Sequence, residues 1–368
     1  MIDAKIALVA DWLTDPGGAE KVVYAMHRMF PEAPIYTSIY DKDKLPMFED
    51  ADVRTSFIQK WPAAKHHHQW YLKWMPVAFE QFDLSEYDIV ISSSHSCAKG
   101  IITKPQTMHI SYCHTPMRYV WDDCHRYLKD YPWPNMMKKV AAYVLHDIRL
   151  WDRLAADRVD YFISNSDYIG ERISKYYKAK SETIYPIVET DNFYLSSDTG
   201  NFYLAVGRLI PYKRFDLIVE AFNHLGKPLK IVGRGPEMQR LKRMARQNIE
   251  FLDYVSDEQL RELLSTCKAF VFPQVEDFGI APVEAMASGR PVIAYADGGA
   301  LETVQDGKSG VFFDTQSADA LIKAVLRFEK KKFNGKSIAD SVAEFGRDRF
   351  ERELKSFISR KWKSFNRK

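Results

Sequence analysis

The fold is decided by the stretch Ala269-Phe-Val-Phe-Pro-Gln-Val-Glu276-Asp-Phe-Gly279-Ile-Ala-Pro-Val-Glu284-Ala-Met-Ala-Ser-Gly289-Arg-Pro-Val-Ile-Ala294. It predicts a short apolar strand, then a loop with Glu276, and then a helix that carries Glu284 in its first turns and ends before Gly289. Open α/β sheets bind ligands where such loops leave the carboxyl ends of parallel strands. Two carboxylates at that edge can accept strong hydrogen bonds from the hydroxyl groups of a sugar ring or a ribose.

Strand-like and helix-like runs alternate along the whole chain, which is typical of parallel, doubly wound sheets. A polar linker at Ser196–Gly200 separates two periodic halves. We therefore expect an α/β protein with two Rossmann-like domains that face each other across a cleft. The predicted strands are Ile6–Ala10, Ile35–Tyr40, Ile89–Ser93, His109–Tyr112, Tyr161–Asn165, Thr183–Pro186, Phe202–Val206, Leu229–Val232, Ile249–Leu252, Ala269–Phe272, Val292–Ala294 and Val311–Phe313.

Length and composition agree with this expectation. A chain of 368 residues suits two domains, which we place at 1–195 and 196–345, with a C-terminal helix at 346–368. The net charge of +3 does not call for a nucleic-acid partner. Four cysteines without paired spacing indicate reduced thiols, and the chain begins with a predicted strand rather than a signal peptide, so we expect a cytoplasmic protein.

Two segments raise the question of membrane contact, although no stretch approaches the ~20 apolar residues of a membrane span. Aromatic and basic residues alternate in Phe57–Phe82, which fits either an amphipathic segment at a membrane interface or a helix packed on the core. Basic residues also crowd Lys330–Lys368, as a solvated helix face or as a contact for anionic lipid. We expect a peripheral contact with the cytoplasmic face of the inner membrane.

A second loop at the same predicted sheet edge is basic. The strand Phe202–Val206 ends in Gly207-Arg208-Leu-Ile-Pro-Tyr-Lys213 and then enters a helix. A helix N-terminus attracts anions, and two cations beside it can neutralise a diphosphate and stabilise it as it leaves. The sequence therefore predicts that Arg208 and Lys213 bind a diphosphate.

These motifs together resemble the donor site of retaining GT-B glycosyltransferases, specifically glycosyltransferase family 4. The resemblance covers nearly the whole chain and is most specific in the C-terminal half. It implies the GT-B fold, with the last helix crossing back to the N-terminal domain, and a nucleotide sugar as donor. It also implies that Glu276 holds hydroxyls of the donor sugar and Glu284 the ribose diol. Gln274-Val275 before Glu276 departs from the family pattern and leaves the sugar open.

The resemblance assigns further residues to the site. Gly17 and Gly18 would let backbone approach the phosphate or sugar, and His114 would lie near the reacting sugar. The predicted catalytic residues are His114, Arg208, Lys213 and Glu276. The predicted donor-binding residues are Gly17, Gly18, Gly207, Arg208, Lys213, Gly233, Arg234, Tyr254, Val255, Glu276, Phe278, Gly279, Ile280 and Glu284. On the acceptor side, the prediction names Asp15, Arg118 and Trp121.

The strings Gly17-Gly-Ala-Glu20 and His114-Thr-Pro-Met-Arg-Tyr-Val-Trp-Asp122 look most like bacterial mannosyltransferases that build O-antigen or capsule. The resemblance thus favours GDP-mannose as donor and a saccharide or lipid-linked saccharide as acceptor. UDP-glucose, UDP-galactose and a UDP-N-acetylhexosamine stay open as donors.

Other classes of function fit less well. Asp41-Lys-Asp43 and Asp50-Ala-Asp52 match the metal-binding pattern of another transferase fold but follow no convincing strand, so we expect no metal and no cofactor. The turn at Gly233-Arg234-Gly235 has Met238 where a dinucleotide fingerprint needs its third glycine, which argues against a nicotinamide oxidoreductase. A non-catalytic nucleotide-sugar-binding protein on this fold stays open.

Overall fold

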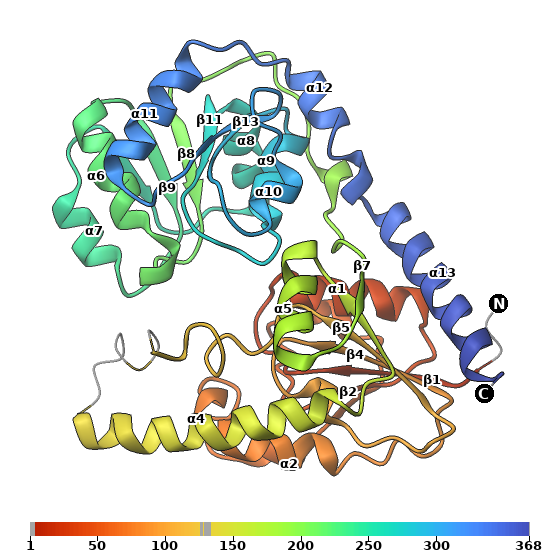
Figure 1. The fold of residues 1–368 in the computed structure, drawn as a ribbon. Coiled ribbons are helices and arrows are strands. Elements are labelled where there is room, and N and C mark those ends of the chain that lie inside the picture. Colours follow the sequence, from red (N-terminus) through yellow and green to blue (C-terminus); the bar gives the residue numbers. More distant parts are fainter. Residues whose placement is uncertain (1–3, 126–127, 129–133, 368) are drawn as a thin grey trace. The chain divides into compact units, whose positions relative to one another are not determined.

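The computed structural model describes residues 4–125, 128 and 134–367 and divides the chain into two compact units (Figure 1). Unit 1 comprises the residues up to Ile187 together with those from Phe350 onward, and unit 2 is Val188–Arg349. Each unit is built on one parallel sheet with helices on both faces. The prediction of two Rossmann-like parallel sheets is therefore confirmed.

Unit 1 contains a 7-stranded sheet in the order β3-β2-β1-β4-β5-β6-β7. Alternate residues of its central strands enter two separate cores, because successive side chains of a strand point to opposite faces. Leu8, for example, belongs to one core, while its neighbours Ala7 and Val9 belong to the other. The strands are β1 (Ile6–Ala10), β2 (Ile35–Thr37), β3 (Val53–Thr55), β4 (Ile89–Ser94), β5 (Met108–Cys113), β6 (Tyr161–Ser164) and β7 (Ser181–Thr183).

The helices of unit 1 bury one face each. Helix α5 begins where the Ser166 hydroxyl accepts a hydrogen bond from the Ile169 N–H at 3.1 Å, an N-cap of the usual kind. The α-helices are α1 (Gly18–Met29), α2 (Met75–Glu80), α4 (Asn135–Ala156), α5 (Asp167–Tyr177) and α13 (Arg347–Phe365). Short 3₁₀ helices are η1 (Pro46–Phe48), η2 (Phe57–Lys60), η3 (His68–Trp74) and η4 (Ala98–Gly100).

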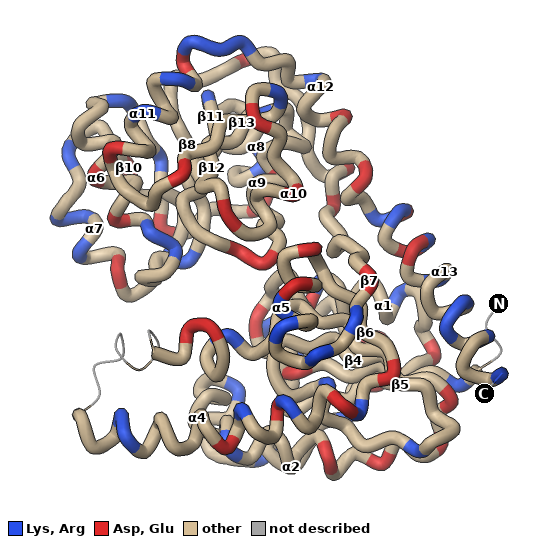
Figure 2. Tube along the Cα trace, viewed as in Figure 1, with Lys and Arg blue, Asp and Glu red and all other residues tan. Residues whose placement is uncertain are grey.

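Helix α13 completes the core of unit 1, as predicted for the C-terminal helix. Phe350, Leu354, Phe357 and Ile358 recur on one face of the helix and are buried against the sheet residues. The ring of Phe350 meets Tyr112 of β5 edge to face, with 6.0 Å between the ring centroids. Charged residues of both signs occupy the remainder of the helix (Figure 2).

Unit 2 contains a 6-stranded sheet in the order β10-β9-β8-β11-β12-β13. Helix α8 begins with a capping box, in which the Ser256 hydroxyl and the Gln259 side chain each bond the other residue's backbone N–H. The strands are β8 (Tyr203–Val206), β9 (Leu229–Val232), β10 (Ile249–Leu252), β11 (Ala269–Phe272), β12 (Val292–Tyr295) and β13 (Gly310–Phe313). The helices are α6 (Phe215–Leu225), α7 (Met238–Met244), α8 (Asp257–Thr266), α9 (Ile280–Ala287), α10 (Ala300–Thr303), α11 (Ala318–Glu329) and α12 (Gly335–Asp340), with 3₁₀ turns η5 (Thr190–Asn192), η6 (Pro211–Lys213) and η7 (Ala343–Phe345).

Four local predictions differ from the structure. Strand β2 ends at Thr37 rather than at Tyr40. The edge strand β3 was not expected, because its side chains are at least partly exposed and show no apolar pattern. Strand β7 is Ser181–Thr183 rather than Thr183–Pro186. The segment Phe57–Phe82 forms η2, η3 and α2 rather than one helix. Among the described residues, no helix is long and apolar enough to cross a bilayer.

The packing of α13 predicts that the stability of unit 1 depends on this helix. Leu354→Ala should lower the free energy of unfolding of unit 1 by about 2–5 kcal/mol, since a fully buried leucine leaves a cavity. Every tryptophan among the described residues lies in unit 1, so tryptophan fluorescence during urea unfolding reports on that unit. The exposed neighbour Ser356→Ala is the control, with an expected change within about 0.5 kcal/mol. Equal stability of the two variants would contradict the prediction.

Candidate functional site

Two loops at the carboxyl edge of the sheet of unit 2 lie backbone against backbone. The loop after β8 and the loop after β9 are joined by a hydrogen bond from the Leu209 N–H to the Arg234 carbonyl at 2.8 Å. A Cβ on Gly233 would lie 1.9 Å from the Gly207 carbonyl oxygen, and one on Gly235 would lie 2.3 Å from the Leu209 carbonyl oxygen. Both positions therefore require glycine, because a side chain would push the loops apart.

The loop after β8 presents the two predicted cations. Lys213 ends η6, and its Nζ lies 2.9 Å from Oε1 of Glu276, which comes from the loop after β11. The side chains of this pair keep only 17% and 20% of their surface exposed. Arg208 is exposed and makes no ion pair with any residue that the structure describes. The structure thus brings Lys213 and Glu276 together, and Arg208, on the same loop as Lys213, is open to solvent.

The loop that carries Glu276 packs against the backbone of a second pair of glycines, Gly298 and Gly299. The Gly299 N–H donates a hydrogen bond to the Glu276 carbonyl at 2.9 Å. A Cβ on Gly298 would lie 2.5 Å from that same oxygen, and one on Gly299 would lie 2.3 Å from the backbone of Phe278. Phe278 itself is buried and packs edge to face on Phe345, with 5.4 Å between the ring centroids. The Glu276 carboxylate therefore stands on a fixed backbone.

The remaining predicted donor residues of unit 2 lie around this loop. Gly279 has φ of +93° and precedes Ile280, the first residue of α9, whose start has no side-chain cap among the described residues. Glu284 lies one turn into α9 and is partly buried. The guanidinium of Arg234 lies over the ring of Tyr254, 5.7 Å from its centroid, and that tyrosine is 74% exposed. Val255 follows Tyr254 and is partly buried.

In unit 1 the carboxyl ends of β1, β4 and β5 lie side by side and gather several titratable side chains. Asp11 follows β1 and is buried, and its carboxylate accepts backbone hydrogen bonds from three residues of the segment after β4: His95 at 2.6 Å, Ser96 at 2.9 Å and Ala98 at 2.6 Å. The same carboxylate lies 3.1 Å from Nδ1 of His95. Asp11 therefore fixes both the loop and the ring of His95, as the buried carboxylate of an Asp–His pair does.

His114 follows β5 and is almost fully buried. Its Nε2 lies 2.7 Å from the Ser93 hydroxyl, and its ring lies 6.3 Å from that of His95. Burial, with a smaller contribution from the nearby His95, lowers the pKa of His114 to about 3. At neutral pH the ring is uncharged, so His114 can exchange hydrogen bonds but supplies no positive charge.

The predicted glycine pair lies at the start of α1, with Gly17 at the N-cap and Gly18 as the first helical residue. A Cβ on Gly17 would lie 2.6 Å from Oε2 of Glu20, so the absence of a side chain makes room for this carboxyl group. Burial raises the pKa of Glu20 above its usual value. Asp15 is exposed and pairs with Lys44 at 2.6 Å.

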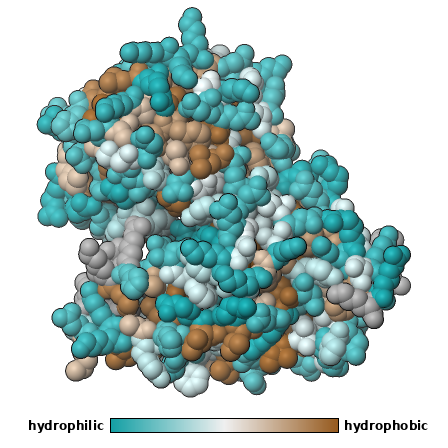
Figure 3. Space-filling model, in the orientation of Figure 1, coloured by the Kyte–Doolittle hydropathy of each residue, from teal (hydrophilic) through white to brown (hydrophobic). Residues whose placement is uncertain are grey.

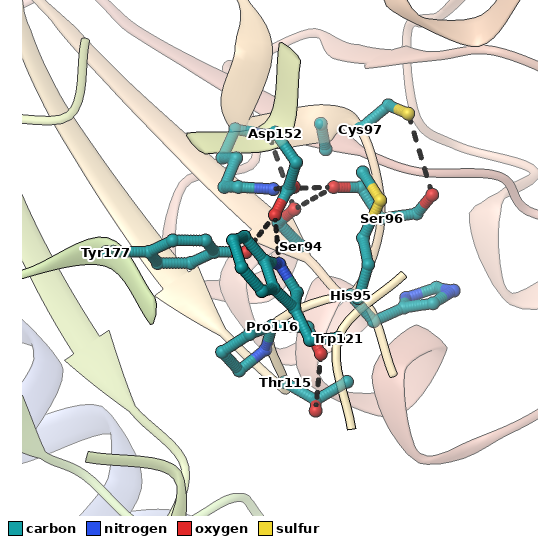
Figure 4. A network of polar contacts seen from close by, with 12 residues as sticks. Ser94, His95, Ser96, Cys97, Thr115, Pro116, Trp121, Asp152 and Tyr177 are labelled. Carbon is teal, nitrogen blue, oxygen red and sulfur yellow. Dashed lines mark hydrogen bonds and ion pairs between the residues drawn. The ribbon is translucent and has the colours of Figure 1, made fainter. Parts of the chain in front are cut away.

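Beneath this edge lies a buried polar network centred on Asp152 of α4 (Figure 4). Asp152 forms an ion pair with Lys99, and both side chains are at most 2% exposed. It also accepts hydrogen bonds from the indole N–H of Trp121 at 2.8 Å and from the Tyr177 hydroxyl at 2.9 Å. Burial alone would lower the pKa of Lys99, but the Asp152 carboxylate outweighs it and the pKa is raised. The hydrogen bonds and the ion pair of Asp152 therefore tie α4, α5 and the segment around Trp121 together.

Of the predicted acceptor-side residues, Trp121 belongs to this network. The polar edge of Trp121 bonds Asp152, while its ring stacks on Tyr176, with 4.8 Å between the centroids. Arg118 is partly buried and accepts a backbone hydrogen bond from Asp123 at 2.9 Å. Sequence reasoning missed Asp11, His95 and Glu20 as site residues. The signal was present for two of them, since Asp11 directly follows a strand and His95 lies in the polar run Ser92–Ser96 at the end of another.

No group of three His, Cys, Asp or Glu side chains within residues 4–125, 128 and 134–367 converges as a metal site would require. Asp41 is buried and approaches Lys65 at 3.4 Å, and Asp52 pairs with Arg54 at 2.7 Å. Both aspartates are therefore used within the fold of unit 1.

Two family models match consecutive parts of the chain. "Glycosyltransferase Family 4" matches residues 16–192, and "Glycosyl transferases group 1" matches residues 188–348. A GDP-mannose-dependent alpha-(1-6)-phosphatidylinositol monomannoside mannosyltransferase of Mycolicibacterium smegmatis is 34% identical over 40% of this chain and 46% of its own length. An O-antigen chain mannosyltransferase of Escherichia coli is 30% identical over 44% of this chain and 42% of its own length. The chain spans about half the length of the curated relatives it matches.

Among solved structures, sucrose-phosphate synthase of Thermosynechococcus elongatus is similar to this chain with a TM-score of 0.73. The alignment covers 98% of this chain and 99% of that one at 17% identity. At this level of identity the likeness concerns the fold, and it extends over the whole chain.

The Asp152 network predicts that the loss of two ion pairs made by α4 lowers the free energy of unfolding by very different amounts. Lys99→Met should lower the free energy of unfolding of unit 1 by about 3–5 kcal/mol, because it leaves a buried carboxylate without its cation. Arg153→Met removes the more exposed pair between Arg153 of α4 and Asp157, the C-cap of that helix, and should cost about 0–1 kcal/mol. Urea unfolding followed by tryptophan fluorescence measures both, and a similar cost for the two variants would contradict the buried pair's role.

Proposed function

The chain belongs to glycosyltransferase family 4, and we propose that it transfers a hexose, with retention of configuration, from a nucleotide sugar to a saccharide or lipid-linked saccharide acceptor. The observation that carries this proposal is the arrangement of Arg208, Lys213 and Glu276 at one edge of the sheet of unit 2. Two cations and a carboxylate on fixed backbone match the two ends of a sugar diphosphate, one anionic and one rich in hydroxyl groups.

In this proposal the cations act on the leaving group. The bond between the anomeric carbon and the diphosphate oxygen breaks, and the diphosphate keeps the electron pair. Arg208 and Lys213 stabilise the charge that grows on that oxygen, as fixed positive groups do in other group-transfer sites. The acceptor hydroxyl oxygen bonds to the anomeric carbon on the same face, and its proton passes to the departing phosphate.

Glu276 and Glu284 hold the neutral parts of the donor. Glu276 is partly buried and paired with Lys213, so its carboxylate lies beside a cation at the proposed sugar position. An ionised carboxylate accepts two or more hydrogen bonds from sugar hydroxyls, and its orientation is fixed by the backbone contacts of Gly298 and Gly299. Glu284, on the next helix, is assigned to the ribose diol, and Arg234 with Tyr254 to the base.

Unit 1 supplies neutral and paired groups in this proposal. His114 is uncharged at neutral pH, so it acts as a hydrogen-bond partner for the transferred sugar rather than as a cation. Gly17 and Gly18 offer backbone N–H groups at the start of α1, where phosphate or a sugar oxygen is favoured. Asp11 holds His95 in one orientation beside His114, and we assign this pair to positioning the acceptor hydroxyl.

We propose mannose as the sugar and GDP-mannose as the donor. The curated relatives of Mycolicibacterium smegmatis and Escherichia coli are mannosyltransferases by name, and the first is named as GDP-mannose-dependent. The second is named for the O-antigen chain, which supports a surface polysaccharide as the product class. The alternative is a UDP-sugar donor on the same machinery.

Lys213→Ala and Glu276→Ala should each lower the rate of sugar transfer by about 10²–10³-fold, because each removes a charged group that acts on the donor. Lys227→Ala is a matched control, since Lys227 also forms a half-buried ion pair in unit 2, with Glu329 at 2.6 Å. It should leave the rate within about twofold. The measurement is product formation from a labelled nucleotide sugar, with thermal melting to show that each variant is folded. Wild-type rates in either site variant would refute the assignment.

GDP and GDP-mannose should raise the melting temperature of the purified chain, whereas UDP and UDP-glucose should not. A ligand that binds only the native state stabilises it by mass action, by about 2.7 kcal/mol at a hundred times its Kd. A shift with UDP alone would overturn the mannose proposal and keep the fold and site. Binding of a nucleotide sugar without turnover by any saccharide acceptor would favour a non-catalytic binding protein.

A further inference from the structure

A cavity of about 520 Å³ lies at the amino edge of the sheet of unit 2. Two of its lining residues, Lys268 and Pro291, directly precede the parallel strands β11 and β12. The loops that carry Lys213 and Glu276 follow the carboxyl ends of β8 and β11, at the opposite edge of the same sheet. The cavity is therefore separate from the proposed donor site, and its volume is typical of a small-molecule site.

Three segments of unit 2 form the walls of this cavity. They are the linker at residues 195–199, the turn at residues 288–291 between α9 and β12, and residues 328–336, which connect α11 to α12. A Cβ on Gly289 would lie 3.0 Å from the Gly335 carbonyl oxygen, so the second and third walls touch through their backbones. In Figure 2 the connection between α11 and α12 is mostly blue, and Figure 3 shows hydrophilic residues at this end of unit 2.

The charged lining residues are Lys268, Arg290, Lys331 and Lys336 and the single carboxylate of Glu329. That carboxylate is shared by two lysines, since Lys227 and Lys268 each pair with it at 2.6 Å. Arg290, Lys331 and Lys336 make no ion pair with any residue that the structure describes. The cavity therefore carries an excess of positive charge, and three of its cations have no carboxylate partner within the described part of the chain.

Arg290 is the buried member of this group, with only 8% of its surface exposed. Its guanidinium donates hydrogen bonds at 2.7–3.1 Å to four neutral acceptors, the carbonyls of Ser196, Asp198 and Ser265 and the hydroxyl of Thr199. Burial lowers the pKa of Arg290. A buried charge is costly unless an opposite charge is near it, so an anion in the cavity would offset this cost.

Two hydroxyl groups of the linker can donate to such an anion. The Thr199 hydroxyl accepts a hydrogen bond from Arg290, and the Ser196 hydroxyl accepts one from the Asp198 N–H at 3.1 Å. A hydroxyl that accepts in this way still has its own proton to donate. Both residues line the cavity, so neutral donors stand beside the cations.

We propose that this cavity binds a small phosphate monoester of the sugar-phosphate class. The phosphate would accept charge-assisted hydrogen bonds from Lys331 and Lys336, which are short and strong. The remaining volume and the linker hydroxyls suit a body rich in hydroxyl groups. The ring of Phe333 stacks on Phe328, with 5.3 Å between the centroids, and gives the C–H groups of a sugar an apolar wall. This site goes beyond the proposed reaction, in which the cavity takes no part.

The test is a calorimetric titration of the whole chain in a buffer free of phosphate, without nucleotide or acceptor. The probes are glucose 6-phosphate, inorganic phosphate and glucose. We expect glucose 6-phosphate to bind, inorganic phosphate to bind more weakly because it lacks the sugar contacts, and glucose not to bind because it lacks the charge.

Lys331→Ala combined with Lys336→Ala should weaken the binding of glucose 6-phosphate at least about tenfold, because two charged donors are lost. Lys330→Ala combined with Lys332→Ala is the matched control, since these lysines lie in the same segment but do not line the cavity. It should leave the affinity within about twofold. All four lysines are exposed, so we expect both variants to fold, which thermal melting checks.

Lys213→Ala separates this cavity from the donor site, and it should bind glucose 6-phosphate as the native chain does. Loss of binding in this variant would assign the compound to the donor site and overturn the proposal. Absence of binding by either phosphate compound would also overturn it, as would unchanged affinity in the Lys331→Ala, Lys336→Ala variant. Equal affinity for inorganic phosphate and glucose 6-phosphate would refute the sugar-phosphate class.

Discussion

The site of unit 2 depends on contact between two backbones. The loops after β8 and β9 approach so closely that Gly233 and Gly235 leave no room for a Cβ, and the Leu209 N–H finds its partner on the opposite loop. A buried amide without such a partner would be costly, so the contact and the hydrogen bond stabilise one another. This stacking fixes where the loop after β8 runs, and thereby where Arg208 and Lys213 stand.

In unit 1 the loops at the sheet edge are held in place by side chains rather than by contacts between backbones. Its loops are held by buried carboxylates that collect donors from several segments: Asp11 from the backbone after β4, and Asp152 from Lys99, Trp121 and Tyr177. A carboxylate accepts several hydrogen bonds at once, so a single residue can order three pieces of chain. Both units are thus built on parallel sheets, but close backbone contacts hold the loops of unit 2, whereas buried carboxylates hold the loops of unit 1.

The sequence was sufficient for features that are local and periodic. Strands such as β1, β9 and β10 and the loops that carry Lys213 and Glu276 follow from apolar runs and the residues after them, and the structure brings those two side chains together. Features set by distant partners could not be predicted. The edge strand β3 exists because β2 pairs with it, and Asp11 looks like an ordinary aspartate until the backbone after β4 is placed against it. The roles of all the predicted site residues, Lys213 and Glu276 included, stay predictions.

The position of α13 has a consequence for how the protein is made. The core of unit 1 includes Phe350, Leu354, Phe357 and Ile358, and the ribosome adds these residues only after all of unit 2. Unit 2 is continuous in the chain, so it can reach its native state while unit 1, although begun first, still lacks one wall of its core. During synthesis unit 1 therefore exposes the apolar surface that α13 later covers until the last residues of the chain have been added.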